Sequence, residues 1–108
     1  MPYVFSYVRY PLNKTDEVAK TYIESIKEYR TQLKPLAKEV VPNALKVSMD
    51  GIEATNVLEV KEGKLDEFLL FHGKIMMNYH DIEGFQYTSE VRATITEALG
   101  LIGMKPPD

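Results

Sequence analysis

The segment ALKVSMDGIEATNVLEV, residues 44–60, decides the fold because it predicts two antiparallel strands joined by a tight turn. Apolar and polar side chains alternate on both sides of Asp50-Gly51, a pair that favours a type I′ hairpin turn. Alternation gives each strand one apolar and one polar face, as in a sheet that is covered on one side only. We therefore predict a β-hairpin whose apolar face turns toward a core.

The residues that flank the hairpin show the same pattern twice, a strand and a helix. Residues 3–10 are rich in aromatic and β-branched types, which predicts a strand, and residues 13–33 carry a helical apolar stripe. Residues 36–42 then read as a connector to the hairpin. After the hairpin, residues 64–84 carry a second helical stripe, and residues 85–95 alternate as a last strand.

A short terminal helix is predicted after the last strand. Thr94 and Glu97 have the spacing of a capping box, in which each side chain bonds to the other residue's backbone. We expect this helix to dock on the domain, because Leu99, Leu101 and Ile102 need burial.

This order of elements predicts an α+β fold and a single domain, residues 1–108. The arrangement is ferredoxin-like βαββαβ: a four-stranded antiparallel sheet with two helices on one face and a short C-terminal helix. One side of residues 3–10 and a set of polar side chains are then left on the open face. The polar set is Lys46, Ser48, Glu53, Thr55, Glu59, Gln86, Thr88, Glu90 and Arg92.

Composition excludes several classes of function. The chain has no cysteine, so disulfides and thiolate metal sites are absent. Its formal net charge is −3 and its basic residues are scattered, which argues against nucleic-acid binding. No apolar run is long enough to span a membrane, and the start lacks a signal-peptide pattern, so we expect a cytoplasmic protein. His72 and His80 are too far apart on one helix to share a metal, and we predict no metal site and no cofactor.

The chain resembles the dimeric α/β-barrel superfamily in length, in element order, in a first strand that starts at residue 3 and in its terminal helix. The segment Ile82-Glu83-Gly84-Phe85-Gln86-Tyr87 is also similar to an "IEGF-Y" segment of small uncharacterised archaeal-type proteins. In that superfamily two ferredoxin-like chains pack their open sheet faces together, so the resemblance implies a homodimer. Its members include cofactor-free monooxygenases, small isomerases, haem-binding enzymes and stress-induced proteins. None of their catalytic motifs matches this chain, and no catalytic residue is assigned.

The candidate binding residues are His72, Tyr7, Tyr87, Glu90 and Arg92. His72 lies on an apolar stripe, so it is either a core histidine with a depressed pKa or a group that faces a pocket shared with Tyr7 and Tyr87. Glu90 and Arg92 point to the same side of the last strand, where they form either a paired polar interface or the lining of a cavity.

Three functions are compatible with these residues. The first is a homodimer without catalysis that binds a small apolar or aromatic molecule or has a structural role. The second is a cofactor-independent enzyme, monooxygenase- or isomerase-like, with a pocket between helices and sheet and His72 as its acid–base group. The third is an interaction module that uses the open sheet face. The first and second functions are distinguished by whether His72 lines an accessible cavity. We favour the first function, because the sequence does not bring a nucleophile, a base and oxyanion donors together.

Overall fold

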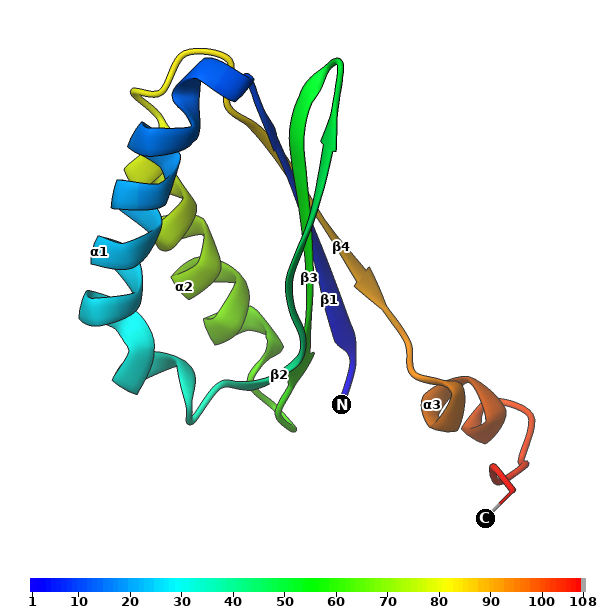
Figure 1. Ribbon diagram of the computed structural model, residues 1–108. Coiled ribbons are helices and arrows are strands. Elements are labelled where there is room, and N and C mark those ends of the chain that lie inside the picture. The colour runs from blue at the N-terminus through cyan, green and yellow to red at the C-terminus, as the bar shows by residue number, and fades with distance from the viewer. Residues whose placement is uncertain (108) are drawn as a thin grey trace.

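A computed structural model describes residues 1–107 and confirms an α+β fold built on a four-stranded antiparallel sheet. The strand order is β2-β3-β1-β4, and α1 and α2 lie together on one side of the sheet (Figure 1). The elements in chain order are β1 (Tyr3–Tyr10), η1 (Leu12–Lys14), α1 (Thr15–Leu33), β2 (Ala37–Ser48), β3 (Gly51–Val60), α2 (Leu65–Met76), η2 (Met77–Tyr79), β4 (Gln86–Arg92) and α3 (Ile95–Gly100). None of the helices in this part of the chain is long and apolar enough to cross a membrane.

The core between the helices and the sheet consists of two apolar clusters, one toward each end of α2. Phe68, at the start of α2, is fully buried in the first cluster, and Met76, at its end, belongs to the second. The first cluster also contains Val4, Leu36, Ala37, Leu58 and Val60. The second contains Tyr10, Val18, Ile52, Tyr79 and Ile82. Burial of these side chains holds both helices on one face of the sheet.

A polar row separates the two clusters. Ser6 on β1 pairs with Asn56 on β3 and with Ser89 on β4, so the three side chains lie side by side on the helix-covered face. Ser6 is buried, and the Asn56 Oδ1 atom is buried without a hydrogen-bond partner among residues 1–107. The middle of the core is therefore less apolar than either end.

The hairpin between β2 and β3 forms as predicted, but its turn does not. Ser48 pairs with Gly51, so the two loop residues are Met49 and Asp50, one position earlier than the sequence indicates. Within residues 1–107 only glycines have a positive φ, which excludes a type I′ turn at Met49-Asp50. Gly51 is needed for another reason, because a Cβ there would lie 2.4 Å from the carbonyl oxygen of Tyr10.

Strand β2 begins at Ala37, so the prediction of a connector over residues 36–42 is wrong. Pro42 lies inside the strand, and the register with β3 shifts between Glu39 and Val41 and again between Val41 and Ala44. β2 is an edge strand, where a proline without an N–H can be accommodated at an irregularity. Because of this proline, the sequence pattern does not indicate a strand in the first half of β2.

Helix α3 has the predicted capping box but does not dock on its own chain. It follows β4 and projects from the domain on the side away from α1 and α2 (Figure 1). The side chains of Leu101 and Ile102 are 87% and 67% exposed, so the expectation that they are buried is wrong for a single chain.

Candidate functional site

The open face of the sheet is the strongest candidate site, because none of the helices in residues 1–107 covers it and strand pairing orders its side chains in rows. Tyr7 of β1 pairs with Thr55 of β3 and Thr88 of β4, and Arg9 pairs with Glu53 and Gln86. Directly paired residues share a face, so these two rows are polar except for the Tyr7 ring. The next rows, Val57–Phe5–Glu90 and Glu59–Tyr3–Arg92, carry most of the aromatic surface.

An aromatic row along β1 is held in place by Arg92. The Phe5 ring lies between those of Tyr3 and Tyr7, with centroid separations of 6.5 Å and 6.3 Å. The Arg92 guanidinium lies 4.3 Å from the centre of the Phe5 ring and donates to the Tyr7 hydroxyl oxygen (3.2 Å) and to a Glu90 carboxylate oxygen (2.5 Å). One cation thus orients a ring, a hydroxyl and a carboxylate on the same face.

A shallow groove of about 400 Å³ occupies the polar end of this face. Its floor includes the backbone of Val8, Ala54 and Tyr87, whose side chains point to the other face of the sheet. Arg9 and Glu53 form a loose ion pair across it (3.9 Å), and both side chains are about half exposed. The side chains that line the groove are Tyr7, Arg9, Glu53, Thr55, Gln86 and Thr88.

His72 lies on the opposite side of the sheet, in the helix layer. Its ring stacks on Phe68 at 5.6 Å, and it lies four residues from both Phe68 of the first cluster and Met76 of the second. Burial lowers its pKa below the ordinary value of 6.5, in the direction that the sequence predicts. The ring is therefore neutral at pH 7.

The structure brings together three of the five predicted binding residues. Tyr7, Glu90 and Arg92 share the open face and form one hydrogen-bonded group. Tyr87 pairs with Val8, so its side chain and that of His72 belong to the other face. The predicted pocket of Tyr7, His72 and Tyr87 is not formed, because the sheet itself separates Tyr7 from the other two.

The groove includes residues that the sequence does not single out as a site. Arg9 and Glu53 become neighbours only through the register of β1 with β3, which no local pattern gives. A second hollow, of about 210 Å³, lies where α1 meets η2 and is lined by Thr21, Glu24, Ser25, Glu28 and Asn78. Neither the groove nor this hollow is lined by His72.

The "IEGF-Y" segment has a structural role in this chain. Phe85 stacks on Tyr79 (4.6 Å between centroids) and on Tyr10 (6.2 Å), so its ring closes the second core cluster. Burial in this stack raises the pKa of Tyr79 to about 12. Gly84 has a φ of +83°, and a Cβ there would lie 2.6 Å from Pro11 Cγ. These residues connect α2 to β4, while His80 beside them is exposed.

No protein-family model, curated protein or solved structure matches this chain. No group of three or more His, Asp or Glu side chains in residues 1–107 is placed to hold a metal ion.

Proposed function

We propose that this protein is a homodimer in which two chains pack their open sheet faces together and hold a small molecule between them. The element order and the strand order β2-β3-β1-β4 support a ferredoxin-like chain of the dimeric α/β-barrel type. Two stacked sheets would give such a dimer a second core between them.

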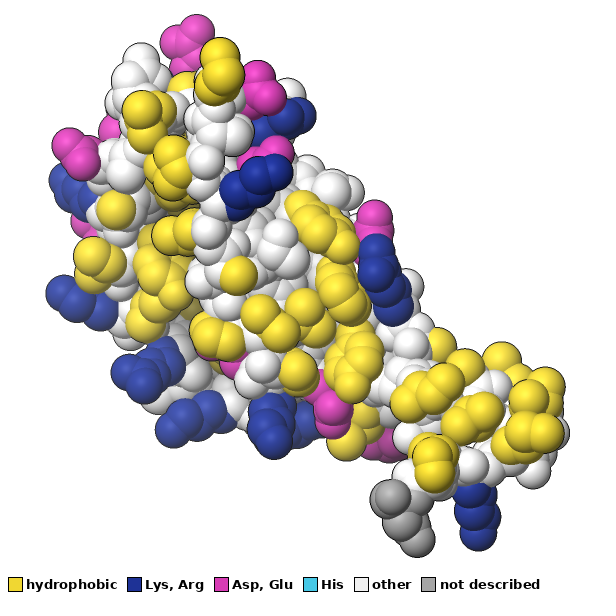
Figure 2. Space-filling model, turned by 45° about the vertical axis from the view of Figure 1, so that its right-hand side comes forward, with side chains coloured by type: hydrophobic (Ala, Val, Ile, Leu, Met, Phe, Trp, Pro, Cys, Tyr) yellow, Lys and Arg dark blue, Asp and Glu magenta, His cyan; other side chains and the backbone are white. Residues whose placement is uncertain are grey.

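The observation that carries the proposal is an aromatic and aliphatic surface on a sheet face without helices. Tyr3, Phe5 and Tyr7 are only half-buried there, and Val41, on the same face of β2, is 38% exposed. Figure 2 shows hydrophobic side chains gathered over the sheet as well as on the projecting helix. Contiguous apolar surface of this kind marks an interaction site in a soluble protein, and its burial supplies about 25 cal/mol per Å².

The chemistry of the two ends of the open face indicates which class of ligand the dimer would bind. The Phe5 end is the more apolar and suits contact between the sheets, whereas the groove at the Arg9 end has space and several polar side chains. The Tyr7 ring offers a stacking surface, Thr55 and Thr88 offer hydroxyls, and Arg9 offers a cation to a carboxylate. We propose a small aromatic acid, enclosed when the partner covers the groove.

Catalysis by His72 has less support than binding. The two hollows described above lie elsewhere, and the ring packs against Phe68 in the core. The non-catalytic reading therefore remains the preferred one.

Light scattering after size-exclusion chromatography tests the dimer. At micromolar concentration we expect twice the chain mass of 12.4 kDa. Phe5→Glu and Val41→Glu, on the open face, should each give folded monomers by circular dichroism. Ile23→Glu, on an exposed position of α1, is the matched control and should remain dimeric. A wild-type particle of one chain mass would refute the proposal.

Thermal unfolding with benzoate tests the ligand class. We expect millimolar benzoate to raise the melting temperature and cyclohexanecarboxylate, which has the same charge but no aromatic ring, to do so less. Arg9→Gln should weaken the stabilisation by both acids, because both carboxylates lose the same cation. If the protein is a dimer but both acids raise its melting temperature equally, the proposal of a homodimer stands and the proposal of an aromatic ligand is refuted.

A further inference from the structure

We propose that the C-terminal arm, residues 95–104, packs against the second copy of the chain and completes the dimer interface. This inference rests on the proposed homodimer and adds an element that the sheet faces do not include.

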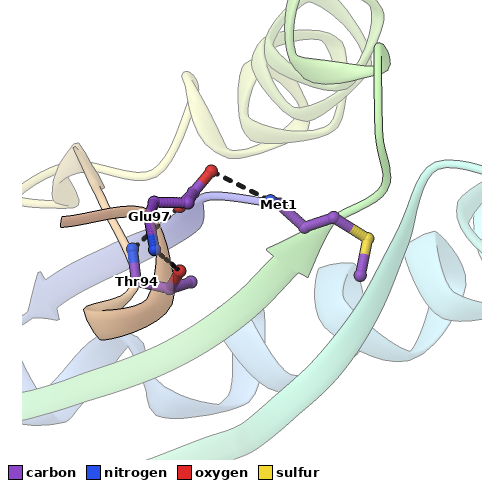
Figure 3. A network of polar contacts seen from close by, with 3 residues as sticks. All are labelled: Met1, Thr94 and Glu97. Carbon is purple, nitrogen blue, oxygen red and sulfur yellow. Dashed lines mark hydrogen bonds and ion pairs between the residues drawn. The ribbon is translucent and has the colours of Figure 1, made fainter. Parts of the chain in front are cut away.

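The arm is a preformed unit with both helix ends satisfied. Thr94 Oγ1 accepts from the Glu97 backbone N–H (3.1 Å), and a Glu97 carboxylate oxygen accepts from the Thr94 N–H (2.8 Å) (Figure 3). After the helix, the Met104 N–H donates to the Leu99 carbonyl oxygen (2.9 Å), and Gly103 has a φ of +73°, as in a Schellman motif. The arm thus has a defined shape before it meets a partner.

An ion pair sets the direction of the arm. The Met1 amino group donates to Glu97 at 2.9 Å, which ties α3 to the start of β1 (Figure 3). Hydrogen bonds from the Thr94 N–H and the Met1 amino group lower the pKa of Glu97, and the Glu97 carboxylate raises the pKa of the Met1 amino group. The pair is therefore charged on both sides across the neutral pH range.

The apolar side chains of the arm are mostly exposed in the single chain. A six-residue helix is only marginally stable in water even when both ends are capped, so burial against a partner surface would stabilise the shape that the caps define. Four of its large apolar side chains are 59% exposed or more. They are Ile95, Leu101, Ile102 and Met104.

The position of the arm indicates that the surface covering it belongs to a second copy of the chain. The arm leaves the sheet after Arg92, which pairs with Tyr3, and so it continues the more apolar end of the open face. It projects on the side of the sheet where the second copy would lie (Figure 1). Four strands of 7 to 12 residues cover about 20 by 30 Å, roughly 600 Å², whereas a stable dimer buries about 800 Å² on each partner. The arm supplies part of the area that the sheet lacks.

Leu101→Ser combined with Ile102→Ser tests this contact without touching the capping box. We expect the dimer dissociation constant, measured by sedimentation equilibrium, to rise at least tenfold. The matched control combines Leu70→Ser on α2 with Ile23→Ser on α1, which are 79% and 52% exposed in the wild-type chain, and should change it less than threefold.

Hydrogen exchange gives a second readout on the intact protein. The amides of Ala98, Leu101 and Met104 should become protected as the protein concentration rises through the dissociation constant, while α2 should not change. Equal protection at all concentrations, or an unchanged dissociation constant in the arm variant, would overturn the proposal. If Phe5→Glu still dissociates the dimer in that case, only the arm contact fails. A wild-type monomer would refute both proposals.

Discussion

His72 and Asn56 are two polar side chains on the helix-covered side of the sheet. Burial of an amide oxygen without a partner costs about 1–3 kcal/mol, and burial of a charged imidazole costs more. The apolar side chains around these two residues must therefore support them. The Phe68 ring stacked on His72 and the Met76 side chain one turn later supply that support. Because burial lowers the pKa of His72, this side chain makes the stability of the core depend on pH below 6.5.

We predict that His72→Leu is tolerated and flattens the dependence of stability on pH. The folded pKa of His72 is lowered, so below pH 6.5 the unfolded chain binds a proton that the folded chain does not. The free energy of unfolding should fall as the pH drops below 6.5 toward the folded pKa, and this part of the fall should be missing in His72→Leu. Urea titrations between pH 4.5 and 7.5 measure it. His80→Leu, at an exposed histidine, serves as the control, and identical profiles for His72→Leu and wild type would contradict the prediction.

At the scale of elements, the loops that contain Gly51 and Gly84 are determined by close contacts with another part of the chain rather than by the turn preferences of their residues. The loop between η2 and β4 passes against Pro11, which leaves no room for a side chain at position 84, and the turn before β3 passes against Tyr10. Both glycines allow a loop to seal the second core cluster.

Gly84→Ala should lower the free energy of unfolding by more than about 1 kcal/mol, because an alanine would need a positive φ and would contact Pro11. Gly73→Ala is the matched substitution inside α2, where a Cβ meets nothing within 4 Å, and it should raise stability by up to about 1 kcal/mol. Denaturant titration of both variants checks the pair. Equal effects would show that the junction at Gly84 can move aside.

Elements whose signal is local could be predicted from the sequence, and those set by distant contacts could not. The helical stripes, the alternation of β4 and the Thr94 cap are local, and they place Glu90 and Arg92 on the open face by parity alone. The position of the hairpin turn depends on the approach of Tyr10, and the Arg9–Glu53 pair depends on strand register over more than forty residues. The exposure of α3 could not be predicted, because its apolar residues indicate burial without indicating which surface would cover them.

For the whole molecule, the shape is elongated rather than compact. The extents are 50 × 31 × 20 Å and the radius of gyration is 15.6 Å, whereas a compact domain of this length has about 13 Å. The arm at one end and the long β2-β3 hairpin at the other produce the excess. A chain of this shape gains more from association than a compact one does, because its projecting elements have little of their own chain to pack against.

We predict that Pro42 protects the edge of β2 from pairing with strands of other molecules. β2 has a free edge twelve residues long, with Val40 and Val41 exposed beside the proline, and such an edge could recruit the strands of other molecules into fibrils. Without an N–H, and with the ladder shifted around it, Pro42 breaks this template in the middle. Pro42→Thr should shorten the lag before thioflavin T fluorescence rises in agitated solutions. The control is Asn43→Thr, which introduces a threonine at the adjacent position and should leave the lag near the wild-type value. An equal lag for Pro42→Thr and wild type would show that the edge is guarded by other means.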